Sequence, residues 1–107
     1  MTDLFAERVE GKRAALKTKH PKQVAVDDDH CFVGLDGYKK VIDSVDVVLI
    51  ACAAKFHPMY LMAGIQAGKH VFVEKPHGID PAGIQGGNAA TELAKQKNLG
   101  VLSGLQL

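Results

Sequence analysis

The residues best suited to chemistry form the charged tripeptide Glu74-Lys75-Pro76, which directly follows the apolar run Val71-Phe72-Val73. A lysine ammonium at the carboxyl end of a buried strand can bind a substrate hydroxyl and stabilise or relay its proton. The alternative is that Lys75 pairs only with Glu74 or with solvent. This arrangement makes Lys75 the candidate catalytic residue.

A second candidate segment runs from Cys52 to His57, after the apolar run Val47–Ala51. That run predicts a parallel strand covered on both faces. Pro58 suits the first turn of a following helix and Gly68 suits its end, so strand, helix and strand predict a right-handed βαβ unit. In open α/β sheets ligands bind at the carboxyl ends of strands, where both candidate segments are expected.

The remaining chain also alternates between predicted helices and strands. The predicted elements are a helix over 4–19 capped by Thr2-Asp3, a strand over 23–26, a polar turn at 27–29, a short helix after Asp36, a helix over 81–97 with Asp80 as N-cap and Asn98 as its stop, and a strand over 101–103. This order indicates an α/β fold with a parallel sheet and flanking helices.

Two apolar stripes indicate how helices pack. Phe5, Val9 and Leu16 share one face of the first helix. One face of the last predicted helix carries small residues, which predicts that the helix packs closely on a sheet. These residues are Gly83, Gly87, Ala90 and Ala94.

Composition excludes several classes of function. The 107 residues carry a formal charge of +1, which provides no long-range field for nucleic acid or an anionic membrane. No apolar run has transmembrane length, and the first residues do not resemble a signal peptide, so cytoplasm is the default location, although a longer parent protein could be exported. Cys31 and Cys52 are expected as reduced thiols, and the five histidines lack metal-ligand spacing, so no metal site is expected.

One longer pattern resembles a known family. The segment A-x-x-x-x-F-H-P, followed by A-G-K-H-V-F-V-E-K-P, closely resembles the Gfo/Idh/MocA oxidoreductases, sugar and inositol dehydrogenases with a Rossmann domain and a C-terminal substrate domain. The resemblance covers essentially all 107 residues. It implies a partial Rossmann-type parallel sheet, an NAD or NADP cofactor with NAD favoured, and hydride transfer involving a sugar or cyclitol hydroxyl.

The resemblance also assigns roles to individual residues. Lys75 would touch the cofactor and assist catalysis, and Glu74 would contact the nicotinamide-side ribose unless it is only a solvated acid. Pro76 is expected to follow a cis bond, as is common in the family. The remaining predicted cofactor contacts are Asp3, Ala51, Cys52, Phe56, His57 and Gln106.

Three of these assignments have alternatives or departures. Asp3 would bind the adenosine ribose hydroxyls, which favours NAD, but it could equally serve as a helix N-cap. His57 could contact the cofactor or simply pack its loop. Around Cys52 the family's usual Thr and Pro are replaced, which removes a hydroxyl and some rigidity. A nucleophilic Cys52 is not favoured because no base accompanies it.

The sequence contains no G-x-G-x-x-G turn, the motif that cradles a dinucleotide pyrophosphate. By resemblance, residues 1–107 form an incomplete dinucleotide-binding domain without the first two strands and without the substrate domain. The strand at 23–26 would then have no neighbour, and the strand Val47–Ala51 would expose an open edge.

Three functions remain open at this point. The first is part of an NAD(P)-dependent sugar or cyclitol dehydrogenase, inactive as this chain alone. The second is a non-catalytic fragment or assembly module that pairs through its open edge, with a homo-oligomer as one such assembly. The third is an α/β signalling domain of the flavodoxin or receiver type, which leaves Glu74-Lys75-Pro76 unexplained.

Overall fold

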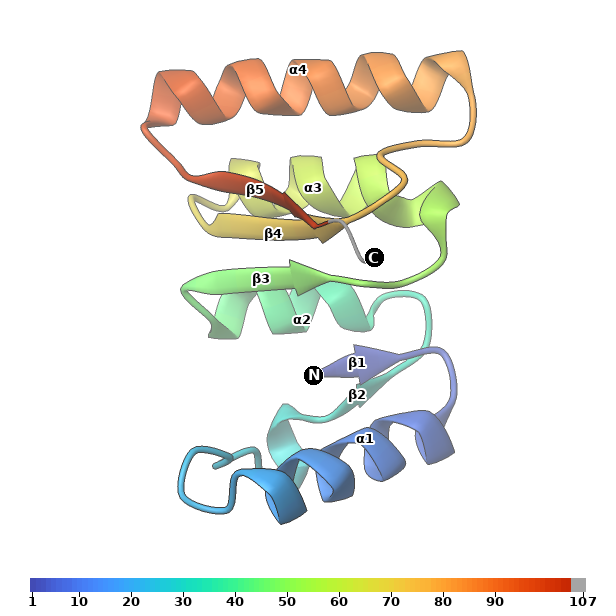
Figure 1. Cartoon of the computed structure of the whole chain (residues 1–107), viewed down its shortest axis with the longest axis vertical. Helices are drawn as coiled ribbons and strands as arrows, with labels where there is room; N and C mark the ends of the chain where they lie inside the picture. The colour runs from blue at the N-terminus through green and yellow to red at the C-terminus, as the bar shows by residue number, and fades with distance from the viewer. Residues whose placement is uncertain (105–107) are drawn as a thin grey trace. The chain divides into compact units, whose positions relative to one another are not determined.

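The computed structural model describes residues 1–104, in which helices alternate with parallel strands (Figure 1). The chain divides into two compact units, the first spanning Met1–Ser44 and the second beginning at Val45. The strands form one parallel sheet in each unit. This confirms the predicted α/β class and the partial Rossmann-type parallel sheet with flanking helices. No helix among these residues is long and apolar enough to cross a membrane.

The first unit is built on two short strands. β1 (Thr2–Asp3) pairs in parallel with β2 (Phe32–Val33), and the helices are α1 (Ala6–Lys19) and α2 (Gly37–Ser44). A Cβ atom on Gly37 would lie 2.2 Å from the Thr2 hydroxyl oxygen, so only glycine allows α2 to begin so close to β1.

The predicted strand at 23–26 is wrong. The amides of Gln23 and Val24 both donate to the His20 carbonyl, closing a turn after α1, so these donors are not available to a strand ladder. The strand forms later, at Phe32–Val33, after a 3-10 helix η1 (Asp28–His30). It also has a neighbour, because β1 pairs with it.

The two strands expected to be absent included the one that should carry Asp3, and for that strand the prediction is wrong, because Asp3 is the last residue of β1. The first helix therefore begins at Ala6 rather than Leu4, and Asp3 does not cap it. Its Oδ1 instead accepts from the Phe5 amide at 3.2 Å. Of the predicted apolar face only Val9 is buried, since Phe5 and Leu16 are exposed.

The turn at η1 generates a pH-dependent prediction. The Asp27 carboxylate accepts from the backbone amide and ring of His30, and the ring's hydrogen bond holds the pKa of Asp27 below its ordinary 3.8. Because the folded-state pKa is lowered, the stabilisation is present above about pH 4 and is lost as the pH falls through the lowered value. A carbon-13 NMR titration should show this lowered pKa, and His30→Gln should return it toward 3.8. An unchanged pKa in that variant would contradict the assigned cause.

The second unit holds a three-stranded parallel sheet. Its strands are β3 (Val47–Ile50), β4 (His70–Glu74) and β5 (Val101–Gly104), in that order, and its helices are α3 (His57–Gln66) and α4 (Pro81–Lys97). A 3-10 helix, η2 (Ala54–Phe56), precedes α3. The buried apolar residues of this unit are Val48, Ile50, Leu61, Ile65, Val71, Val73, Ala90 and Ala94.

β3 was predicted to be covered on both faces, and this is wrong. Val48 and Ile50 are buried, whereas Val47 is 52% and Leu49 75% exposed. The alternation is that of a strand covered on one face. Within its sheet β3 pairs with β4 alone, so it is an edge strand of that sheet, as predicted.

Both helices of this unit end as predicted. Gly68 adopts a φ of 77° after α3, and the Lys69 amide donates to the Gly64 carbonyl, which together form a Schellman motif. Asn98, at φ 57°, ends α4 in the left-handed region. The small-residue stripe of α4 packs mainly on α3 rather than on the sheet, because a Cβ atom on Gly83 would lie 3.3 Å from Pro58 Cγ.

The start of α4 gives a stability prediction. Asp80 Oδ1 accepts from the Gly83 amide at 2.6 Å, which satisfies one of the helix's unpaired donors. Asp80→Ala should lower the free energy of unfolding by about 1 kcal/mol, measured by urea denaturation. Asp80→Asn, which retains a capping oxygen, is the matched control and should stay close to the wild type. Equal losses in both variants would show that the cap is not the cause.

Candidate functional site

The candidate site lies where the three parallel strands of the second unit end. Ile50 pairs with Val73 and Glu74 with Gly104, so the carboxyl ends of β3, β4 and β5 share one edge of the sheet. The loop from Ala51 leads into η2 and α3, and the loop from Lys75 leads into α4. The sequence had predicted both loops at this edge.

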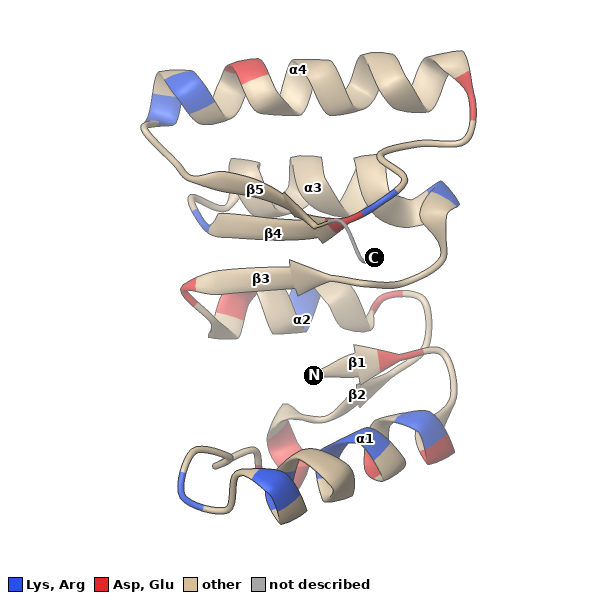
Figure 2. Cartoon of the chain, viewed as in Figure 1, with Lys and Arg blue, Asp and Glu red and all other residues tan. Residues whose placement is uncertain are grey.

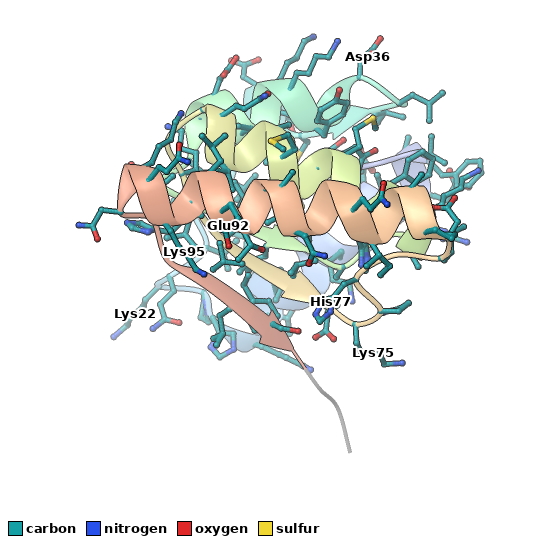
Figure 3. The ribbon with its side chains drawn as sticks, turned by 90° about the horizontal axis from the view of Figure 1, so that it is seen from above. Lys22, Asp36, Lys75, His77, Glu92 and Lys95 are labelled. Atoms are coloured by element: carbon teal, nitrogen blue, oxygen red, sulfur yellow. The ribbon has the colours of Figure 1, made fainter. Side chains whose placement is uncertain are left out.

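Lys75 directly follows β4 and its side chain is exposed. Figure 2 shows an acidic and a basic residue adjoining at the end of this strand, and Figure 3 shows Lys75 extending outward from its loop. Across residues 1–104, none of the ion pairs within 4.0 Å joins Lys75 to Glu74. Of the alternative for Lys75, the structure therefore does not show the pairing with Glu74, whereas the exposed side chain does contact solvent.

Glu74 ends β4, half-buried, opposite Gly104 of β5. A Cβ atom on Gly104 would lie 3.0 Å from Glu74 Oε1 and 2.6 Å from the Phe72 ring. The glycine therefore leaves room for the carboxylate beside the sheet edge.

This close approach predicts the effect of a single methyl group. Gly104→Ala should displace the Glu74 and Phe72 side chains and destabilise the fold by about 1–3 kcal/mol, as overpacking does. Urea denaturation gives the stability, and the carboxyl carbon-13 resonance of Glu74 reports its displacement. Gly100→Ala is the control, because a Cβ atom there would lie 3.4 Å from the nearest His70 atom. A Glu74 resonance unmoved in Gly104→Ala would contradict the assigned contact.

The loop after Lys75 is tied to two other elements. The Lys75–Pro76 peptide is cis, as expected, and the Pro76 carbonyl accepts a hydrogen bond from His57 Nδ1 at 2.7 Å. His77 Nε2 is hydrogen-bonded to the Ser103 hydroxyl of β5. These contacts join the loop to α3 and to the last strand.

The loop after β3 presents small residues, with Ala51 and Cys52 exposed. The Phe56 ring stacks on Tyr60, with centroids 5.6 Å apart and planes 11° from parallel. His57 is only 1% exposed, and its Nε2 lies 2.9 Å from the Cys52 carbonyl oxygen. The structure thus brings the predicted residues 51, 52, 56, 57 and 74–76 to one edge of one unit.

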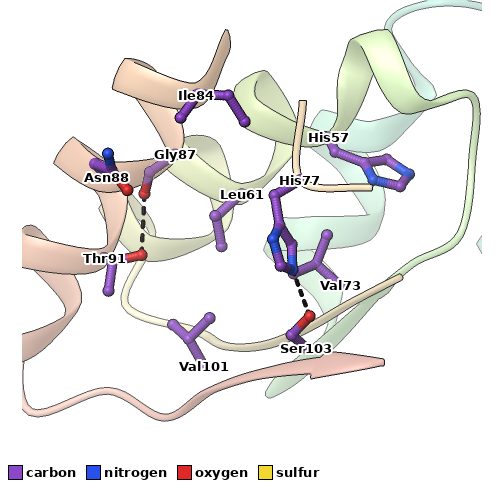
Figure 4. A pocket seen from close by; sticks show the side chains of 10 residues that line it. All are labelled: His57, Leu61, Val73, His77, Ile84, Gly87, Asn88, Thr91, Val101 and Ser103. Atoms are coloured by element: carbon purple, nitrogen blue, oxygen red, sulfur yellow. Dashed lines mark hydrogen bonds between the residues drawn. The ribbon is translucent and has the colours of Figure 1, made fainter. Parts of the chain in front are cut away.

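A cavity of about 240 Å³ lies beneath α4, beside this edge (Figure 4). Its polar lining includes His77, Ser103, Asn88 and Thr91, and the Thr91 hydroxyl donates to the Gly87 carbonyl. Sequence analysis assigned no role to any of these four residues. The only signal in the sequence is that His77 immediately follows the charged tripeptide, since the partners of Ser103 depend on strand register.

Two predicted contacts lie elsewhere. Asp3 ends β1 in the first unit, where it borders a cavity of about 360 Å³ with Arg8 and Lys12 among its other lining residues. Gln106 lies outside the described residues. The predicted roles of both residues stay predictions.

The groups at the edge suit the nicotinamide end of a dinucleotide. The Glu74 carboxylate can accept from ribose hydroxyls, the Lys75 ammonium carries a positive charge, and small residues at Ala51–Ala54 allow close approach to backbone amides. The sequence has no glycine-rich turn for the pyrophosphate. The fit therefore concerns the ribose and nicotinamide only.

Comparison with known proteins agrees with this geometry. A family model described as "Oxidoreductase family, NAD-binding Rossmann fold" matches residues 6–104. Curated protein sequences gave no significant match.

Similar solved structures share the fold. They include an NAD binding oxidoreductase from Klebsiella pneumoniae (TM-score 0.67, 22% identity, covering 96% of this chain and 24% of that one). Scyllo-inositol dehydrogenase from Lactobacillus casei gives TM-score 0.68 and 23% identity, over 96% and 27% of the two chains. UDP-N-acetylglucosamine 3-dehydrogenase from Acidithiobacillus ferrooxidans gives 0.69 and 23%, over 96% and 29%. The chain thus spans about a quarter of the length of these proteins.

Proposed function

The chain belongs to the Gfo/Idh/MocA family of NAD-binding Rossmann-fold oxidoreductases, and we propose that it is part of a dehydrogenase that transfers hydride between a nicotinamide cofactor and a sugar or cyclitol hydroxyl. The observation that carries the proposal is Lys75. Its exposed ammonium stands at the carboxyl end of β4, next to Glu74 but without an ion pair to it among residues 1–104.

Each group has a distinct task in this proposal. The cofactor, when bound, supplies hydride acceptance or donation. Lys75 binds the reacting hydroxyl oxygen and stabilises or relays its proton as hydride leaves carbon. Glu74 accepts hydrogen bonds from the hydroxyls of the nicotinamide-side ribose and so orients the attached nicotinamide ring beside Lys75. The backbone at Ala51 and Cys52 lies along the cofactor, with Phe56 beside it.

The substrate class and cofactor preference are inferred from chemistry and from relatives. The solved relatives include dehydrogenases of an inositol and of a UDP-sugar, which supports a polyhydroxylated substrate. Asp3 favours NAD, because a carboxylate accepts from the two adenosine ribose hydroxyls and repels a 2′-phosphate. We place the protein in the cytoplasm, acting on small molecules rather than nucleic acid or membranes.

A second candidate function rests on the edge of the three-stranded sheet. β3 pairs only with β4 in this sheet, and Val47 and Leu49 are exposed. Such a strand can pair with another chain, which suits a non-catalytic assembly module or a homo-oligomer. Size-exclusion chromatography with and without NAD separates the two functions, because a monomer that binds NAD argues against the assembly module.

The test of the dehydrogenase is a lysine substitution in the protein that carries this chain, expressed from its own gene. Lys75→Met should lower NAD-dependent oxidation of the preferred sugar or cyclitol by about 100- to 10,000-fold, because it removes the group that handles the proton. NADH absorbance measures the rate across a panel of inositols and sugars.

Lys95→Met is the matched control, because Lys95 is an exposed lysine of α4 that pairs with Glu92. It should keep the wild-type rate. Undiminished turnover in Lys75→Met would remove Lys75 from the mechanism, and no nicotinamide-dependent turnover in the wild type would overturn the proposed function.

A further inference from the structure

His57 is the one buried polar side chain in the part of the chain that the structure describes, and both its ring nitrogens have partners. The residue is 1% exposed. Nδ1 lies 2.7 Å from the Pro76 carbonyl oxygen and Nε2 lies 2.9 Å from the Cys52 carbonyl oxygen. A buried imidazole is costly unless it is hydrogen-bonded, so these bonds keep the ring in the interior.

The two acceptors occupy matching places in adjacent loops. Cys52 lies two residues beyond the end of β3, and Pro76 lies two residues beyond the end of β4. The two strands pair directly, with Ile50 opposite Val73. From the first turn of α3, where Figure 4 labels it, His57 therefore bridges both loops of the candidate site through these two hydrogen bonds.

The direction of these bonds follows from the acceptors. A carbonyl oxygen only accepts, so each ring nitrogen must donate for its bond to form. The neutral ring has one N–H and forms one bond at a time, whereas the protonated ring forms both. Pro76 has no amide hydrogen with which to anchor itself, so its carbonyl is its only backbone group that can hold the loop.

We propose that His57 is a positioning residue, which holds the backbone beside Lys75 by donating from Nδ1 to the Pro76 carbonyl. The inference rests on the proposed function of Lys75 in hydride transfer. It gives His57 a different task from direct contact with the cofactor, because both ring nitrogens face backbone carbonyls and the ring is covered. The His57 side chain thereby fixes the backbone from which the Lys75 side chain extends.

Three substitutions separate the two bonds. Asparagine places its amide nitrogen near the position of Nδ1, and glutamine places it near Nε2, so His57→Asn retains the donor to Pro76 and His57→Gln the donor to Cys52. His57→Phe keeps a ring but has no donor. His70→Phe is the matched control, since His70 accepts from the Gly100 amide at the opposite end of β4.

Two measurements read the result in the protein that carries this chain. NMR order parameters of the Lys75 and His77 amides should fall from about 0.85 to below about 0.6 in His57→Phe and His57→Gln, and should stay near the wild-type value in His57→Asn. In His57→Phe and His57→Gln, kcat should fall by up to about 100-fold, whereas His57→Asn should largely retain it. The KM for NAD should change less than kcat, because a misplaced catalytic group slows the reaction more than it weakens binding.

The outcomes are distinct. Equal behaviour of His57→Asn and His57→Gln, unchanged order parameters in His57→Phe, or the same loss in His70→Phe would each overturn the positioning role. Wild-type protein without nicotinamide-dependent turnover would overturn the proposed function instead. In that case the order parameters alone still decide whether His57 holds the loop.

Discussion

The candidate site depends on the parallel pairing of β4 with β3 on one side and β5 on the other. Parallel strands end at the same edge, so the pairing gathers residues that the sequence separates by helices. Glu74 meets Gly104, and the loops after Ile50 and Glu74 become neighbours. Without this register neither the hydrogen bonds of His57 nor the contact between His77 and Ser103 would form.

The edge combines ordered backbone with exposed charge. Hydrogen bonds to His57 and Ser103 hold Pro76 and His77 in the second loop, while the side chain of the preceding residue, Lys75, remains exposed. A charged side chain on a held backbone loses less conformational entropy when it binds a ligand than one on a mobile loop. Anchoring hydrogen bonds and exposed charge are therefore divided between adjacent residues of a single short segment.

Sequence predicted the second unit better than the first. Pro58, Gly68, Asp80 and Asn98 each have a local effect on the backbone, and the helices they delimit form largely where predicted. The strand at Phe32–Val33 was missed because it is only two residues long. It also depends on pairing with Thr2–Asp3, which lies thirty residues earlier in the sequence. Local pattern contains no information about such pairing. The strand predicted at 23–26 failed for a different reason, because the turn that closes on the His20 carbonyl uses the amides of Gln23 and Val24.

The same limit applies to the site. The charged tripeptide was recognisable from its letters, and its place at a strand end followed from the apolar run before it. The partners of His57 were not predictable, because backbone carbonyls leave no trace in the sequence. Likewise the exposure of Leu49 reflects which faces the helices cover, whereas an apolar run alone suggests burial on both sides.

A single α-helix lies between the two strands of each parallel pair in the described residues, and this bears on the order of folding. The entropy lost in closing a loop grows only slowly with its length, so no pair is much costlier to close than another. β3, α3 and β4 can therefore associate before α4 has left the ribosome. The loop that holds Lys75 would then gain its His57 anchor during synthesis and its Ser103 anchor only after β5 has emerged.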